Sequence, residues 1–117
     1  MPTFILHTNI PEFDHGLETA MHSEIREIIS HEIGKSKDFV LTVFHKGVSM
    51  RFGETDKSVA YCEIKNVGKL SNDTTSQMSK LICLLLTEKL MIDAKQIYIE
   101  YQESERHLWG WNGVTFA

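Results

Sequence analysis

The second residue of the chain is a proline, and this position gives it a chemistry that no internal residue has. Pro2 follows Met1 and precedes the apolar run Thr3–Leu6. A small second residue favours removal of Met1, which would leave Pro2 with a free secondary amine. A strand starting here would hold that amine at a fixed point of the fold. An apolar pocket or a nearby cation would lower its pKa below the usual value of about 8, which would give a free base at neutral pH.

Lys35 is a cation near the end of a predicted helix. It follows Gly34, a residue type that commonly ends helices in the left-handed conformation. From the residues alone, Lys35 is best interpreted as a solvated cation after a helix C-terminus, where positive charge suits the helix dipole.

The residues that must position Pro2 and Lys35 predict a strand, a helix and a second strand. Phe4–Thr8 is short and apolar, and Phe39–Phe44 is a longer apolar run that predicts a largely buried strand. Between them, Asp14 is suited to an N-cap and Gly34 to the C-terminal position. The apolar residues of this segment recur at the spacing of an amphipathic helix: Leu17, Ala20, Met21, Ile25, Ile28, Ile29 and Ile33.

The same order recurs in the second half. Val59–Lys65 and Ile97–Tyr101 predict strands, and Asn72-Asp73 predicts the cap of a helix between them. The inner face of that helix is expected to include Met78, Leu81, Ile82, Leu85 and Leu90. Two such units predict an α/β fold with a pseudo-twofold, in which two helices cover one face of a four-stranded mixed sheet. The other face then needs cover, which favours self-association.

Composition sets further limits. The 117 residues predict one domain, 1–117, of soluble globular character with a net charge of −4, which argues against nonspecific nucleic-acid binding. No apolar run approaches the ~20 residues of a membrane span, and no signal segment is evident, so we expect cytosolic synthesis.

Cys62 and Cys83 form no CxxC motif and are expected to be buried thiols. The six histidines lack the spacing of a metal site.

Several segments together resemble one family over essentially the whole chain. They are Pro2–Ile5, Thr8–Pro11, Gly34-Lys35, Arg51–Gly53, Asn66–Lys69, Ser79–Cys83, Ile97–Tyr101 and the tail Gly110–Ala117. The chain resembles the macrophage migration inhibitory factor family of the tautomerase superfamily. The D-dopachrome tautomerase family is less similar because its tail lacks Gly-Trp-Asn. A ferredoxin-like fold also contains two strand–helix–strand units, but it gives no role to Pro2.

The resemblance implies a homotrimer with sites between subunits and no metal or organic cofactor. It implies keto–enol tautomerisation of phenylpyruvate-like aromatic 2-oxo acids and isomerisation of dopachrome analogues. Pro2 would be the base, Lys35 would bind the substrate carboxylate, and the Val67 N–H would be a second donor. The positive charge of Lys35 would also lower the pKa of the Pro2 amine.

The resemblance also implies an aromatic pocket that includes Phe39, Tyr98 and Trp109, although core packing is the alternative for Phe39 and Tyr98. Strand alternation places Tyr98 and Glu100 on one face, from which they could reach the site of a neighbouring subunit. Phe39, Trp109 and Glu100 depart from the tyrosine, valine and asparagine that relatives carry. These departures make the pocket mouth bulkier and more acidic.

Other functions are implied by the same resemblance. Family members act outside the cell as cytokine-like signals, so a secreted ligand for a cell-surface receptor of the invariant-chain type is an alternative, with export that needs no signal peptide. A dithiol oxidoreductase is disfavoured because Val59–Cys62 keeps only one cysteine of the CxxC found in vertebrate relatives. A nuclease role has little support from the acidic charge.

Overall fold

The structure is a computed structural model that describes residues 1–117. Two strand–helix–strand units follow one another along the chain. The first consists of strand β1 (Thr3–Thr8), helix α1 (His15–Ile33) and strand β2 (Leu41–His45). The second consists of β3 (Ala60–Val67), α2 (Asn72–Leu90) and β4 (Ile97–Ser104). The predicted repeat is confirmed, with β3 and β4 each extending beyond the expected C-terminal residue.

Short elements complete the chain. They are the 3-10 helices η1 (Lys37–Phe39), η2 (Ala94–Gln96) and η3 (Arg106–Leu108), and the strands β5 (Gly110–Trp111) and β6 (Val114–Thr115). The last two pair as a small antiparallel hairpin. The sequence did not predict this hairpin, because strands of two residues carry no readable periodicity.

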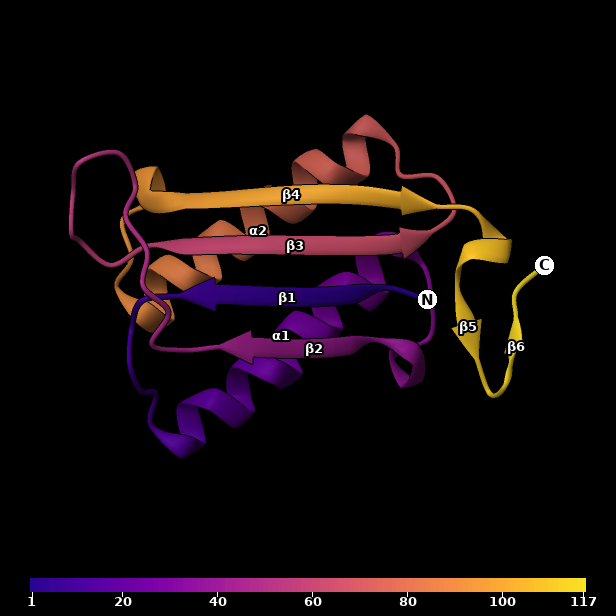
Figure 1. Ribbon diagram of the computed structural model, residues 1–117, viewed down its shortest axis with the longest axis horizontal. Coiled ribbons are helices and arrows are strands. Elements are labelled where there is room, and N and C mark those ends of the chain that lie inside the picture. The colour runs from indigo at the N-terminus through magenta and orange to yellow at the C-terminus, as the bar shows by residue number, and fades with distance from the viewer.

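The four long strands form one mixed sheet in the order β2-β1-β3-β4 (Figure 1). Strand β1 is parallel to β2 and antiparallel to β3, which is parallel to β4. The predicted α/β architecture with a pseudo-twofold is therefore confirmed. Its two halves meet at the antiparallel β1–β3 pair in the centre of the sheet.

This topology gathers distant segments at one end of the sheet. Because β3 is antiparallel to β1, the start of β1 lies beside the end of β3, where Thr3 pairs with Lys65. Thr3 also pairs with Leu41 at the start of β2, and Val67 pairs with Ser104 at the end of β4. The N-terminus and the β5–β6 hairpin lie at this same end, which we call the Pro2 end of the sheet (Figure 1).

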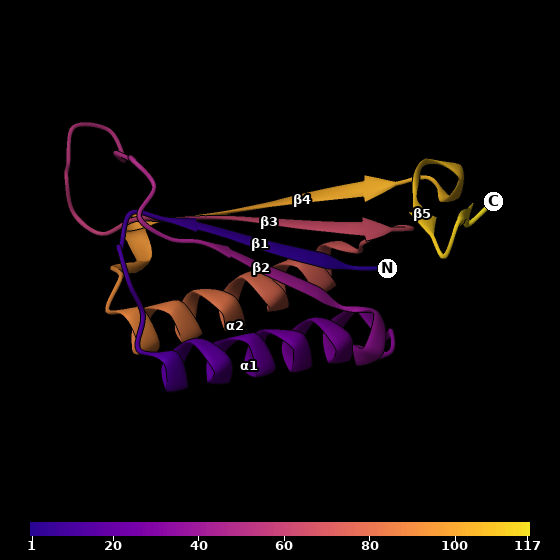
Figure 2. The ribbon, with the colours of Figure 1, turned by 60° about the horizontal axis from the view of Figure 1, so that its bottom comes forward.

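Both helices cover the same face of the sheet, and the opposite face is open (Figure 2). Phe4 and Leu6 from β1, with Cys62 and Ile64 from β3, are fully buried beneath the helices. The helices contribute apolar side chains at the predicted spacing, and those that are fully buried are Met21, Ile25, Ile29, Met78, Ile82 and Leu86. Each such side chain stabilises the fold by about 1.5–3 kcal/mol. No helix combines the length and apolar character that crossing a membrane requires.

Ala20, one of the apolar residues at helical spacing, is exposed, because it lies on the outer edge of the apolar face of α1. The prediction for the second strand was wrong in its start and in its burial. The strand expected over Phe39–Phe44 is not largely buried and begins only at Leu41, since η1 occupies Lys37–Phe39. Strand β2 is an edge strand, and Leu41 on its open face is 57% exposed.

The helix ends follow from their capping residues. The Asp14 carboxylate accepts a hydrogen bond from the backbone N–H of Leu17, and Gly34 ends α1 at φ 76°. Both caps were predicted. The cap of α2 is Ser71, whose hydroxyl accepts from the N–H of Thr74, in place of the expected Asn72-Asp73. Serine, asparagine and aspartate all cap well, so sequence alone does not decide which of three consecutive residues does so.

Candidate functional site

Pro2 lies directly before β1 and is buried at the centre of the Pro2 end of the sheet. Its carbonyl oxygen accepts a hydrogen bond of 3.1 Å from the backbone N–H of Leu41. The next residue, Thr3, is paired on both sides, with β2 and with β3. The start of the chain is therefore held by strands on both sides, as the apolar run after Pro2 led us to expect.

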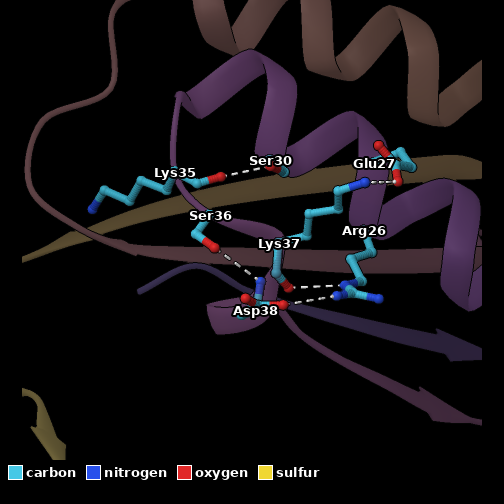
Figure 3. Close-up of polar contacts among 7 residues, drawn as sticks. All are labelled: Arg26, Glu27, Ser30, Lys35, Ser36, Lys37 and Asp38. Atoms are coloured by element: carbon cyan, nitrogen blue, oxygen red, sulfur yellow. Dashed lines mark hydrogen bonds and ion pairs between the residues drawn. The ribbon is translucent and has the colours of Figure 1, made fainter.

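Lys35 is positioned by the end of α1. Gly34 turns the chain in the left-handed region, and the Ser30 hydroxyl then donates a hydrogen bond of 2.5 Å to the Lys35 carbonyl oxygen. The Lys35 side chain extends away from the contacts among Arg26, Lys37 and Asp38 on the other side of the loop (Figure 3). The loop thus directs the ammonium group toward the end of β3.

The Lys35 ammonium is bound at that point by two acceptors. Its Nζ donates to the Val67 carbonyl oxygen at 2.5 Å and to Asn66 Oδ1 at 3.2 Å. Lys35 is half-buried, and Asn66 is almost fully buried. A freely solvated loop cation does not describe this geometry. An ammonium has three donors, and the third N–H of Lys35 is directed to the N-terminal amine of Met1.

The N-terminal amine lies beside this ammonium. Burial, and then hydrogen bonding to and repulsion by Lys35, lower the pKa of the Met1 amine from 8.0 to about 6. Both influences act in the same direction, because each disfavours a second positive charge at this point. The amine is therefore largely a free base at neutral pH.

A cavity of about 560 Å³ opens at the Pro2 end of the sheet. Two cations and several apolar groups form its wall, and no carboxylate does. The residues are Met1, Lys35, Ser36, Phe39, Val67, Gly68, Arg106 and Phe116. Such a wall suits an apolar ligand with a negative charge, and the free-base amine lies at its surface.

The chain tail forms the far side of the cavity. The Phe116 N–H donates to the Arg106 and Trp109 carbonyl oxygens, both at 3.2 Å, which folds the tail back across the Pro2 end. Phe39 meets Trp111 edge to face, with ring centroids 5.3 Å apart. Trp109, the tryptophan expected in the pocket, is half-buried but does not line the cavity. The hairpin places its neighbour Trp111 against Phe39 instead.

Comparison with known proteins identifies the family. The model of the macrophage migration inhibitory factor family matches residues 1–117. The chain belongs to this family. Mouse macrophage migration inhibitory factor is 31% identical and that of Xenopus tropicalis 28% identical, each with full coverage of both chains. The crystal structure of a homologue from Prochlorococcus marinus aligns with a TM-score of 0.91 at 29% identity, over 98% of this chain and 99% of that one.

The family belongs to the tautomerase superfamily, so the resemblance found in the sequence is confirmed. At a coarse level this membership supports an isomerase reaction. The residues expected to act in that reaction divide into two groups in the structure. Lys35, Phe39 and Val67 line the cavity together with Met1, whereas Tyr98 and Glu100 do not. Pro2, directly after Met1, is buried and is not itself one of the lining residues.

Tyr98 and Glu100 lie on the open face of the sheet, on the side that strand alternation predicted. Tyr98 aligns across the sheet with Tyr61 and then His7, which is five residues along β1 from Pro2. At about 3.3 Å per residue, this places Tyr98 roughly 17 Å along the strand from Pro2 within one chain. Tyr98 packs against Phe52, with centroids 4.7 Å apart.

Glu100 has a partner in its own chain. The Tyr61 hydroxyl donates a hydrogen bond to its carboxylate, and this bond is the main cause that raises the pKa of Tyr61 to about 12. Glu63, in register with Glu100, bonds to His7 at 2.7 Å. The open face therefore carries a polar network, and Glu100 is part of it.

Sequence reasoning missed Arg106, Phe116 and Asn66. Phe116 and Asn66 lie inside segments on which the family resemblance rests. The sequence therefore drew attention to these segments but assigned no role to either residue. Nothing in the sequence singled out Arg106. The expectation of two buried thiols holds only for Cys62, whose burial raises the thiol pKa to about 12; Cys83 is half-buried.

Proposed function

We propose that the chain is a tautomerase that interconverts the keto and enol forms of aromatic 2-oxo acids such as phenylpyruvate, and that it also isomerises dopachrome-like compounds. After removal of Met1, the Pro2 amine is the base. The observation that carries this proposal is the position of the N-terminus beside Lys35 at an apolar cavity, where burial and Lys35 lower the pKa of the Met1 amine to about 6. We expect burial and Lys35 to lower the pKa of the Pro2 amine in the same direction.

The proton transfer needs one base and one site for the carboxylate. The neutral Pro2 nitrogen takes a proton from the carbon next to the carbonyl, and the resulting ammonium returns a proton to the carbonyl oxygen. In the processed chain, which lacks the Met1 amine, the third N–H of Lys35 binds the substrate carboxylate. The Val67 N–H, at the same wall of the cavity, is the second donor. No metal or organic cofactor takes part in these steps.

We further propose that residues 1–117 act as one domain and that three copies form a homotrimer. One sheet face is open, and Tyr98 on it is 64% exposed. Assembly through this face would cover it, and would let Tyr98 and Glu100 enter the site of a neighbouring subunit. Trp109 stays a candidate for the mouth of that shared site.

A second candidate function is a cytokine-like signal. It is favoured by the similarity, along the full chain, to mouse macrophage migration inhibitory factor. In this proposal the protein is cytoplasmic and is released without a signal peptide, the partner is a receptor of the invariant-chain type, and the tautomerase site is vestigial. A Pro2→Gly variant that lost tautomerase activity but kept receptor binding would separate the two functions.

The test of the enzymatic proposal begins with the intact mass of the purified protein, which shows whether Met1 is removed. Phenylpyruvate tautomerisation is then measured for this protein, for a form that retains Met1 and for Pro2→Gly. We expect kcat/KM to fall at least ~100-fold in the last two, in the range of a lost general base. Turnover equal to that of the processed protein in either form would remove Pro2 from the mechanism.

A further inference from the structure

Arg106 holds the tail over the cavity and presents a cation to it. It is the first residue of η3, directly after the end of β4 and Glu105. Its Nε donates a hydrogen bond of 2.7 Å to the Phe116 carbonyl oxygen, and its own carbonyl accepts from the Phe116 N–H at 3.2 Å. The side chain is fixed at one N–H, and four of the five guanidinium N–H donors remain for other partners.

The charge of Arg106 has no acidic partner. Six of the twelve basic side chains form ion pairs, and Arg106 and Lys35 are not among them. The carboxylates near Arg106 in sequence make other contacts, Glu103 with the Lys69 ammonium and Glu105 with the imidazole of His107. Two uncompensated cations therefore share one cavity in a chain whose net charge is −4.

The two cations are separate binding points. Lys35 comes from the loop after α1 and is held at the end of β3, whereas Arg106 follows β4 and is held by the tail. Apolar residues, among them Phe39 and Phe116, share the cavity wall with them. Because the two cations are held from different elements and share an apolar wall, a ligand with two anionic groups joined by an apolar body would satisfy both. A guanidinium binds a carboxylate through two parallel N–H donors, which an ammonium does not offer.

We infer that Arg106 determines substrate specificity by binding a second anionic group, so that the site prefers aromatic 2-oxo acids that carry a further carboxylate on or near the ring. This inference rests on the proposed function and names its substrate class. Lys35 binds the carboxylate of the 2-oxo acid, and Arg106 binds the second one at the opposite end of the apolar body.

The test measures binding, which does not depend on proton transfer. Calorimetric titration of the Met1-free protein compares trans-cinnamate, which has one carboxylate, with 4-carboxycinnamate, which has two. We expect the diacid to bind about tenfold more tightly, as one charge-assisted hydrogen-bonded pair allows. In Arg106→Ala the two acids should bind within about twofold of each other, with the affinity for cinnamate changed less than about threefold.

Two further variants serve as controls for the effect of Arg106→Ala. Arg51→Ala removes an exposed arginine outside the cavity wall and should keep the preference for the diacid. Arg106→Gln keeps an amide donor for the Phe116 carbonyl but removes the charge, so it should lose the preference while the tail stays in place. Circular dichroism and thermal unfolding check that each variant is folded.

Several results would overturn the inference. They are equal affinity of the wild-type protein for the two acids, no binding of either at millimolar concentration, and equal weakening of both acids by Arg106→Ala. Loss of the Arg106→Ala effect in a Glu100→Gln background would also overturn it, because Arg106 would then pair with a carboxylate of the assembly and not with the ligand. Inactive Pro2 chemistry with an intact diacid preference would instead count against the proposed function alone.

Discussion

Lys35 and Asn66 join the end of the first helix to the end of the third strand through a hydrogen bond of 3.2 Å between Lys35 Nζ and Asn66 Oδ1. The two residues lie 31 positions apart in the sequence. Asn66 is 1% exposed, so its amide has few other ways to be satisfied. This contact fixes the one cation that faces both the N-terminal amine and the cavity, and it explains why Lys35 is not a free surface lysine.

Lys35→Ala should raise KM for phenylpyruvate by about tenfold or more with a smaller effect on kcat, because a charge-assisted hydrogen bond to the carboxylate is lost. Steady-state kinetics give the two constants. Lys37→Ala is the matched control, since Lys37 lies two residues away, is exposed and pairs with Glu27. An unchanged KM in Lys35→Ala would return Lys35 to a purely structural role.

The activity should depend on pH through the N-terminal amine, which must be neutral to act as the base. Burial and Lys35 lower the pKa of the Met1 amine, and we expect them to lower that of the Pro2 amine below its ordinary value of about 8, so kcat/KM should rise with pH and level off near neutrality. Lys35→Ala should move the rising limb to higher pH, because removing a cation raises the pKa of the amine. A pH–rate profile of both proteins checks this, and a rising limb centred near pH 8 in the wild type would contradict it.

In the chain that retains Met1, the Met1 amine links stability to pH. Its pKa is about 6 in the folded chain and about 8 when unfolded, so between these values the unfolded chain binds more protons. The free energy of unfolding should therefore increase as the pH rises from about 6 to 8. Urea unfolding at several pH values gives this slope, and an N-terminally acetylated form is the control that should lack this contribution.

Glu100→Asn should have one effect within the chain and one across subunits. Within the chain, the pKa of Tyr61 should fall from about 12 toward its ordinary value, which an ultraviolet titration of tyrosinate measures. Across subunits, removing the carboxylate should shift the rising limb of the pH–rate profile down by roughly 0.4–1.5 units and improve binding of 4-hydroxyphenylpyruvate.

Tyr61→Phe is the companion variant, because it removes the hydroxyl partner and keeps the Glu100 charge. It should not move the pH–rate profile downward. A Glu100→Asn profile and KM identical to those of the wild type would show that Glu100 serves only its own chain.

The assembly should have a mass of about 40 kDa by light scattering, three times the chain mass of 13.4 kDa. Leu41→Lys should weaken it, because Leu41 is exposed on the open sheet face, where burying a lysine charge without a partner is costly. Leu84→Lys changes a comparably exposed leucine on helix α2 and should leave the mass unchanged. A monomer at micromolar concentration would refute both the trimer and the shared site.

The sequence by itself determined the parts that depend on local spacing. The helical period of the apolar residues, the caps Asp14 and Gly34, and the alternation that puts Tyr98 and Glu100 on one face were all read correctly, because each depends on neighbours within a few residues. The resemblance along the whole chain identified the family, because the segments that match the family occur in the same order and at the same spacing. Competition among three consecutive residues that all cap well caused the error at Ser71, and the short helix η1 delayed the start of β2.

Tertiary structure alone decided which residues meet at the cavity. The antiparallel pairing of β1 with β3 brings Pro2 beside Asn66, and so beside Lys35, across a long stretch of sequence. The tail folds back through backbone hydrogen bonds, which place Trp111 and not Trp109 against Phe39. The same turn of the chain places Arg106 at the cavity wall. Such contacts depend on strand direction and register, and those properties leave no periodic mark in the residues that they bring together.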